Sequence, residues 1–243
     1  MIEVENLVKT YGPVQAVQGL SLAVQAGEIL GLVGPNGAGK TTTLRCLTGI
    51  IPPTSGRVKI AGFDLSTQPV EAKRRLAFVP DEPRLFDYLT AWDHLVMTSR
   101  LYGVADGPDR AKLLLAEFEL SDRRNAYPSE LSRGMKQKLM VAMALVHRPQ
   151  AMLLDEPLTG LDPAAMRRMK TRIRDTAKEG VAVILSSHML HLVEELCGRV
   201  VVVVRGKKAL DGTLEEIRRA SPGLAGDADL EAIFMKAVEG DAG

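Results

Sequence analysis

One short run of residues has the types and the spacing needed to hold a polyphosphate. It consists of Gly34, Pro35, Asn36, Gly37, Ala38, Gly39, Lys40, Thr41 and Thr42. Glycines allow successive backbone N–H groups to turn toward one concavity, and the start of the following helix adds partial positive charge. Lys40 can reach the terminal phosphates, and the Thr41 hydroxyl can hold Mg²⁺. The run therefore predicts a phosphate-binding loop for a nucleoside triphosphate, the alternative being a glycine-rich turn that caps a helix.

A second group of reactive side chains follows an apolar strand, in the stretch Ala151-Met152-Leu153-Leu154-Asp155-Glu156-Pro157. Asp155 can serve as a metal anchor, and Glu156 can act as a general base toward an attacking water. Acidic residues after a strand are commonly just a solvated loop. The phosphate-binding loop in the same chain favours the catalytic interpretation.

The surrounding pattern predicts an α/β fold that brings these two groups together. Short apolar runs bounded by helical spacing are typical of parallel strands covered on both faces. The runs at 151–154, 181–185 and 199–204 fit this pattern. Residues 28–33 read as a buried strand and 57–60 and 76–79 as further short strands, after an antiparallel, turn-rich start at 2–8 and 14–24. Helical spacing at 39–50 follows the glycine-rich run.

The same pattern predicts one α/β core with a helical insertion. We expect residues 1–83 and 151–210 to form this core, with a helical subdomain at 84–150 inserted into it. The predicted helices of that insertion lie within 90–148. A tail at 211–243 reads as small helices separated by Ser221-Pro222-Gly223.

Composition limits the classes of partner and the compartment. The 243 residues carry a net charge of only +1, which provides no global field for nucleic acid or anionic lipid. Cys46 and Cys197 lie far apart without metal-ligand spacing, so a reduced cytoplasmic compartment is expected. We find no secretion signal, and the apolar runs at 139–146 and 200–204 are too short to span a membrane.

Together with these motifs, the stretch Leu131-Ser132-Arg133-Gly134-Met135-Lys136-Gln137 resembles the signature of the ATP-binding-cassette (ABC) family, usually Leu-Ser-Gly-Gly-Gln. The resemblance runs from residue 2 to about residue 213. It implies a P-loop NTPase (RecA-like) core with a mostly parallel sheet, an N-terminal antiparallel β subdomain and an inserted α-helical subdomain. It also implies hydrolysis of ATP with Mg²⁺, with Lys40, Glu156 and His188 as catalytic residues.

In that family, two nucleotide-binding domains sandwich two nucleotides. Ser132 and Gly134 would then face the γ-phosphate bound to the opposite subunit, although Ser132 could simply be an N-cap. Asp162, in Leu161-Asp162-Pro163, would lie at the dimer interface, and Asp followed by Pro is also a typical helix start. The resemblance places His188 at the γ-phosphate and Tyr11 against adenine; the alternatives are a loop histidine and a packing tyrosine.

Two positions depart from the family pattern. Asp81 stands where the family has a Gln that meets magnesium and whose loop contacts the membrane partner. An Asp can still approach the metal, but it adds charge and cannot donate as an amide does. In the signature, Arg133 and Met135 replace Gly and Gln. Val-Pro-Asp-Glu-Pro combined with Gly-Met-Lys-Gln-Lys resembles cassettes of two-component, ABC-2 type exporters.

The resemblance implies a homodimer or heterodimer of cassettes and a separate transmembrane permease subunit. It also implies a cytoplasmic protein, peripheral on the inner face of the cell membrane and held there through its partner. No nucleic-acid contact is expected from the basic stretch 166–178, because Met166, Met169, Ile173 and Ala177 share one apolar helical face. The alternatives are a soluble ABC-type ATPase in DNA repair, translation or Fe–S assembly, and a simple kinase.

Overall fold

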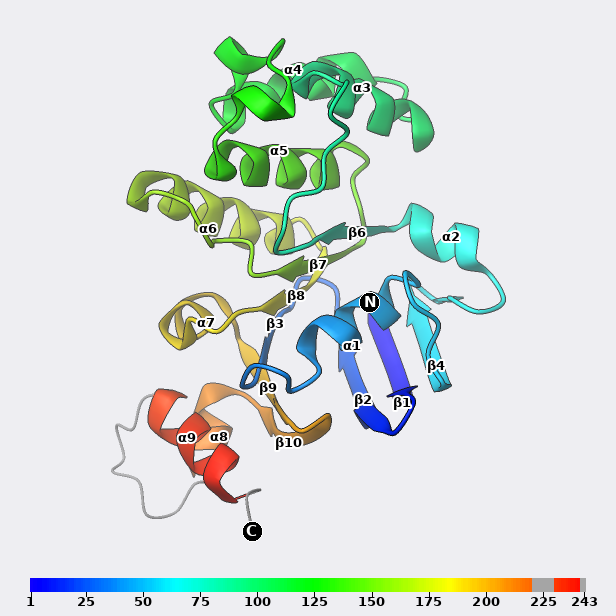
Figure 1. Ribbon diagram of the computed structural model, residues 1–243, viewed down its shortest axis with the longest axis vertical. Helices are drawn as coiled ribbons and strands as arrows, with labels where there is room; N and C mark the ends of the chain where they lie inside the picture. Colours follow the sequence, from blue (N-terminus) through cyan, green and yellow to red (C-terminus); the bar gives the residue numbers. More distant parts are fainter. Residues whose placement is uncertain (220–229, 241–243) are drawn as a thin grey trace.

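A computed structural model describes residues 1–219 and 230–240, and this part of the chain folds around two β-sheets (Figure 1). The larger is a six-stranded sheet in the order β10-β9-β3-β8-β7-β6. Its strands are β3 (Ile29–Val33), β6 (Leu76–Val79), β7 (Ala151–Asp155), β8 (Ala182–Ser186), β9 (Arg199–Val204) and β10 (Lys207–Gly212). All neighbouring pairs are parallel except β9 and β10, so the predicted mostly parallel sheet is confirmed.

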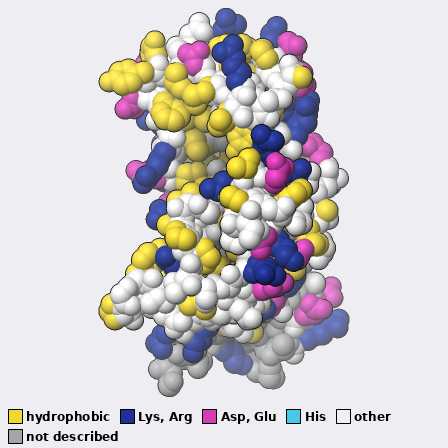
Figure 2. Space-filling view, turned by 90° about the vertical axis from the view of Figure 1, so that its right-hand side faces the viewer, with side chains coloured by type: hydrophobic (Ala, Val, Ile, Leu, Met, Phe, Trp, Pro, Cys, Tyr) yellow, Lys and Arg dark blue, Asp and Glu magenta, His cyan; other side chains and the backbone are white. Residues whose placement is uncertain are grey.

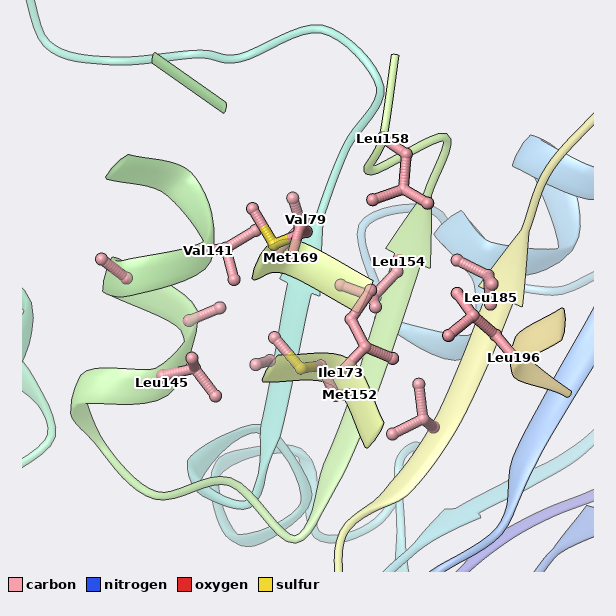
Figure 3. Close-up of a cluster of buried hydrophobic side chains, with 14 of the residues drawn as sticks. Val79, Val141, Leu145, Met152, Leu154, Leu158, Met169, Ile173, Leu185 and Leu196 are labelled. Carbon is pink, nitrogen blue, oxygen red and sulfur yellow. The ribbon is translucent and has the colours of Figure 1, made fainter. Parts of the chain in front are cut away.

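The central strands are buried along their whole length because both faces of the sheet are covered. Every residue of β3, β7 and β8 is buried, as expected of parallel strands between layers. On one face, α5 (Arg133–Val146) and α6 (Pro163–Lys178) contribute Val141, Leu145, Met169 and Ile173 to a cluster over β6, β7 and β8 (Figure 3). The apolar face predicted for α6 is confirmed, since Met169, Ile173 and Ala177 are buried.

The chain begins with the smaller, antiparallel sheet, in the order β2-β1-β4-β5. Its strands are β1 (Ile2–Tyr11), β2 (Val14–Val24), β4 (Ser55–Ile60) and β5 (Phe63–Asp64). Between β2 and β4 the chain passes through β3 and then α1 (Lys40–Leu47). The glycine-rich run connects the carboxyl end of β3 to the start of α1. The predicted antiparallel start is confirmed.

The inserted helices lie between β6 and β7 and form the upper, green part of Figure 1. They are α3 (Ala91–Leu101), α4 (Gly107–Glu117), two short 3₁₀ turns at Ser121–Arg123 and Pro128–Glu130, and α5. The start of α3 is fixed by a capping box in which Thr90 and Asp93 satisfy each other's backbone N–H groups. Nowhere in residues 1–219 or 230–240 is a helix long and apolar enough to cross a membrane.

Several elements differ from the sequence prediction. The strand β10 and the short helix α2 (Pro69–Arg74) are absent from the prediction, and Asp211 and Gly212 belong to β10 rather than to a helical tail. The sequence of β10, KKALDG, has neither apolar alternation nor a buried run, because β10 is an antiparallel edge strand. In the tail, α8 (Leu214–Arg219) and α9 (Leu230–Gly240) are helical as predicted, whereas Ser221-Pro222-Gly223 lies outside the described residues.

Candidate active site

A cavity of about 500 Å³ opens at the carboxyl-terminal edge of the parallel strands. This edge is where ligands bind in open α/β sheets, because strand ends from several crossovers converge there. Most of the predicted site residues line the cavity: Asn36, Gly37, Ala38, Gly39, Lys40, Thr41, Thr42, Asp81, Asp155, Glu156 and His188. Three further lining residues, Ala16, Arg133 and Thr159, were not predicted as site residues.

The glycine-rich loop is shaped by backbone that packs directly against it. A Cβ atom on Gly39 would lie 2.2 Å from the Ala16 carbonyl oxygen, and Gly39 has a φ of 102°, which side chains rarely adopt. A Cβ on Gly34 would lie 2.3 Å from the carbonyl oxygen of Val203. The turn between β9 and β10 braces the loop, because the Gly206 N–H donates to Ala38 O at 2.9 Å. Gly34 and Pro35 therefore shape the loop although they do not line the cavity.

Lys40 begins α1 and folds back over the loop. Its Nζ donates to Gly34 O at 2.6 Å and to Pro35 O at 3.1 Å. Burial lowers the pKa of this ammonium, and the carboxylates of Glu156 and Asp155 oppose that shift. The structure thus places one cation at the centre of the loop, close to two carboxylates.

Asp155 ends β7 and is buried, with 4% of its surface exposed. Burial raises the pKa of Asp155. A hydrogen bond with the Thr41 side chain lowers this pKa, and the carboxylates of Glu156 and Asp81 raise it further. A hydroxyl and a carboxylate that meet in this way fit Mg²⁺, which takes one or two protein oxygens and completes its shell with phosphates and water. In the described part of the chain, no three His, Cys, Asp or Glu side chains form a metal cluster, so the protein alone offers no full cage.

Glu156 is held in an unusual backbone conformation directly after β7. Its φ of 48° lies in the left-handed region, which for a residue other than Gly costs about 1–2 kcal/mol. Its N–H donates to Ser186 O at 2.9 Å, which ties it to the end of β8. The carboxylate accepts from the His188 N–H at 2.8 Å and from the Ser187 hydroxyl at 3.1 Å.

This strained conformation turns Glu156 toward the loop that follows β8. The His188 Nδ1 atom lies 2.9 Å from Glu156 Oε1, and the imidazole is 62% exposed at the cavity. Ser187 is a further residue that the sequence analysis missed. Its adjacency to His188 was the only available signal, since the contact with Glu156 bridges two separate strands.

Ser132, Gly134 and Asp162 lie outside the cavity lining. The Ser132 hydroxyl accepts from Met135 N at 3.2 Å and caps α5. Asp162 caps α6 by accepting from the N–H groups of Ala164 and Ala165, both at 2.9 Å, and these bonds lower the pKa of Asp162. Both capping roles are therefore present, and the interface roles remain predictions.

Tyr11 likewise does not line the cavity. It is 47% exposed, and Lys9 Nζ lies 4.9 Å from the centre of its ring. The exposed part of this ring is available for stacking with a base. The adenine contact remains a prediction.

Comparison with known proteins supports the same assignment. Residues 17–159 match the ABC transporter family profile. Over the whole chain, the protein is 31% identical to the ABC-type transporter ATP-binding protein EcsA of Bacillus subtilis, of which it covers 98%. It is 38% identical to Nod factor export ATP-binding protein I of Burkholderia orbicola, over 87% of this chain and 70% of that protein.

A solved structure described as the ATP binding subunit of an ABC transporter superposes with a TM-score of 0.92 at 33% identity, covering 98% of this chain and 99% of that one. The nucleotide-binding fold, the cavity and these relatives define one class of protein. The chain belongs to the ABC transporter family and is the ATP-binding, ATP-hydrolysing subunit of such a transporter.

Proposed function

We propose that this subunit powers export through a separate membrane-spanning subunit by binding and hydrolysing ATP with Mg²⁺. The observation that carries the chemistry is the convergence of Lys40, Asp155, Glu156 and His188 on one cavity at the ends of β3, β7 and β8. Thr41 and Asp155 would hold Mg²⁺, which neutralises phosphate charge when bound. Asp81 lines the same cavity and would approach the metal through a bound water.

The chain's own residues supply the remaining steps. Backbone N–H groups of the glycine-rich loop and the Lys40 ammonium bind and orient the terminal phosphates. Glu156 orients a water and takes its proton, because its carboxylate is fixed at the cavity by Ser187 and His188. His188 lines the same cavity with an exposed imidazole, which would contact the γ-phosphate.

We place a second cassette across the face that carries Ser132, Gly134 and Asp162. Ser132 and Asp162 are exposed at the N-termini of α5 and α6. The two helix starts lie side by side, since a Cβ on Gly134 would be 3.1 Å from Gly160 O. Adjacent helix N-termini with a Ser hydroxyl favour an anion from a neighbouring subunit, which supports a nucleotide sandwiched between two copies.

The membrane partner has a candidate docking surface near α3. Phe86 and Tyr88, in the segment after β6, are 62% and 92% exposed, and Leu101 at the end of α3 is 80% exposed. Figure 2, which faces the right-hand side of Figure 1, shows hydrophobic side chains gathered over the upper part of the molecule. His94 of α3 anchors the segment by accepting from the Phe86 N–H at 2.9 Å and stacking on its ring. This surface would hold the cassette peripherally on the cytoplasmic face of the membrane.

Export as the direction is supported by the relatives. Nod factor export ATP-binding protein I is named for export. A second relative, 33% identical over 89% of this chain, is named for linearmycin resistance in Bacillus subtilis, which export of that compound would provide. The decisive experiment is purification of the chain at native abundance from detergent-solubilised membranes, followed by mass spectrometry. Near-equal recovery of a polytopic membrane protein would support the proposal. Recovery only in the soluble fraction, with nucleic acid, ribosomes or an assembly scaffold, would favour a soluble ABC-type ATPase and overturn it.

A further inference from the structure

The two departures from the family pattern meet in space. Arg133 is the first residue of α5, and Asp81 follows the end of β6. The Arg133 Nη2 atom lies 3.6 Å from Asp81 Oδ1, and both side chains line the nucleotide cavity. Asp81, which replaces the usual glutamine, thus lies at ion-pair distance from Arg133, which replaces the usual glycine.

The Arg133 side chain reaches Asp81 by crossing the loop that carries Glu156. A Cβ on Gly160 would lie 3.1 Å from Arg133 Cδ and 3.3 Å from its Nε, so the arginine stem runs over this glycine. Gly160 also has a φ of 78°. One side chain therefore contacts three segments around the cavity: the start of α5, the loop after β7 and the segment after β6.

The charges that line the cavity indicate what the contact between Arg133 and Asp81 does. The carboxylates of Asp81, Asp155 and Glu156 all line this cavity. Without Arg133, Lys40 would be the one Lys or Arg in the described cavity lining to balance them. A nucleoside triphosphate is a polyanion, so an uncompensated Asp81 would oppose its binding.

The pair is too exposed to serve mainly as a brace for the fold. Its side chains are 60% and 52% exposed, and ion pairs this exposed contribute little to the stability of a fold. Its effect should therefore be local, on ligands that enter the cavity beside it.

We propose that Arg133 and Asp81 form a single positioning unit in which the guanidinium neutralises the carboxylate, so that the site accepts triphosphate despite the acidic residue at its edge. This inference rests on the ATP site described above. It concerns the charge balance at the phosphates and does not depend on the identity of the membrane partner.

The test is a double-mutant cycle on ATP affinity, measured by isothermal titration calorimetry with ATP in EDTA and again with excess Mg²⁺. The variants are Arg133→Met, which keeps the aliphatic stem over Gly160, Asp81→Asn, which is isosteric, and the double variant. Arg148→Met is the matched control, because Arg148 pairs with Asp106 at similar exposures, 57% and 50%, away from the cavity.

We expect Arg133→Met to raise the Kd for Mg²⁺-free ATP about 5-fold, because about 1 kcal/mol of compensation is lost. Asp81→Asn should lower the Kd for Mg²⁺-free ATP, because it removes a negative charge beside the phosphates, and the double variant should return to within about 2-fold of wild type. The effect should shrink at high salt, and Arg133→Lys should retain most of the affinity. Arg148→Met should bind ATP as wild type does.

Two outcomes would overturn the proposal that Arg133 neutralises Asp81. If Arg133→Met has no effect, the guanidinium does not compensate Asp81. If the loss in Arg133→Met persists undiminished in the double variant, Arg133 contacts phosphate directly. Thermal unfolding of each variant separates these results from misfolding. If Arg133→Met fails to fold, Arg133→Gln, which also removes the charge, takes its place in the cycle. Failure of wild type to bind ATP would instead refute the nucleotide site.

Discussion

The Oε1 atom of Glu156 lies 2.9 Å from Nδ1 of His188 and 2.8 Å from the His188 backbone nitrogen. Two strand ends, those of β7 and β8, are thereby joined through one carboxylate that also lines the nucleotide cavity. A base fixed at two points is held in orientation for proton transfer, and general-base catalysis typically contributes about 10²–10⁴-fold.

Glu156→Gln should therefore slow steady-state ATP hydrolysis at least about 100-fold while leaving ATP affinity near wild type. The amide keeps the shape of the side chain but cannot take a proton from water. Phosphate release and equilibrium ATP binding are the paired measurements. Unchanged hydrolysis in this variant would remove Glu156 from the base role.

Lys40→Ala should weaken ATP binding, because it removes the cation that lies against Gly34 O and Pro35 O at the centre of the loop. Charge-assisted bonds to a phosphate contribute about 1.5–3 kcal/mol, so we expect a loss of at least about 10-fold in affinity. Titration calorimetry measures this loss directly. Lys178→Ala, on the exposed end of α6, is the control; equal affinities for Lys40→Ala and wild type would contradict the phosphate-binding role of Lys40.

Gly39→Ala should destabilise the fold by more than about 2 kcal/mol, since the new methyl would meet Ala16 O at 2.2 Å in a backbone conformation unfavourable to alanine. Gly198→Ala is the matched control, because a Cβ there meets nothing within 4 Å and its φ is not positive. Urea unfolding compares the two. A Gly39→Ala protein as stable as the control would mean that the loop does not pack on β2 in this way.

His147 should make stability depend on pH. It stacks on Tyr102 with ring centres 3.8 Å apart, and burial lowers its pKa from 6.5 to about 4. The unfolded chain therefore binds a proton that the folded chain rejects between these values. The contribution of neutral His147 to the free energy of unfolding is fully present above pH 6.5 and is lost as the pH falls to about 4. It amounts to at most about 3 kcal/mol in total.

The variant His147→Phe should flatten that part of the pH profile, measured as the urea midpoint from pH 7.5 to 4.5. His191→Phe changes an exposed residue of α7 (Leu190–Leu196) and is the control. A wild-type slope that survives in His147→Phe would assign the pH dependence to other groups.

Tyr88→Glu should reduce recovery of the membrane partner with the cassette, because it places a charge on the most exposed aromatic of the candidate docking surface. Hydrolysis by the isolated subunit should be unaffected, since Tyr88 does not line the cavity. Ile50→Glu, an exposed apolar residue just after α1, is the comparison for surface charge alone. Equal recovery of the partner with both variants would place the docking surface elsewhere.

The parts of the site that are continuous along the chain could be predicted from the sequence alone. Gly34 to Thr41 form one loop between a strand and a helix, and Asp155 and Glu156 are neighbours after a buried apolar run. Both motifs could be predicted because local spacing and strand burial leave a direct pattern in the residues. The parallel strands and the apolar face of α6 followed for the same reason.

The tertiary structure alone decided the relationships between distant segments. Sequence spacing does not reveal that Arg133 crosses Gly160 to reach Asp81, or that β10, which lacks an apolar pattern, braces the phosphate loop through its turn with β9. The left-handed conformation of Glu156 is likewise imposed by hydrogen bonding to Ser186, against its intrinsic preference. Such contacts depend on how packed layers fix loop directions in space, and no local propensity encodes that geometry.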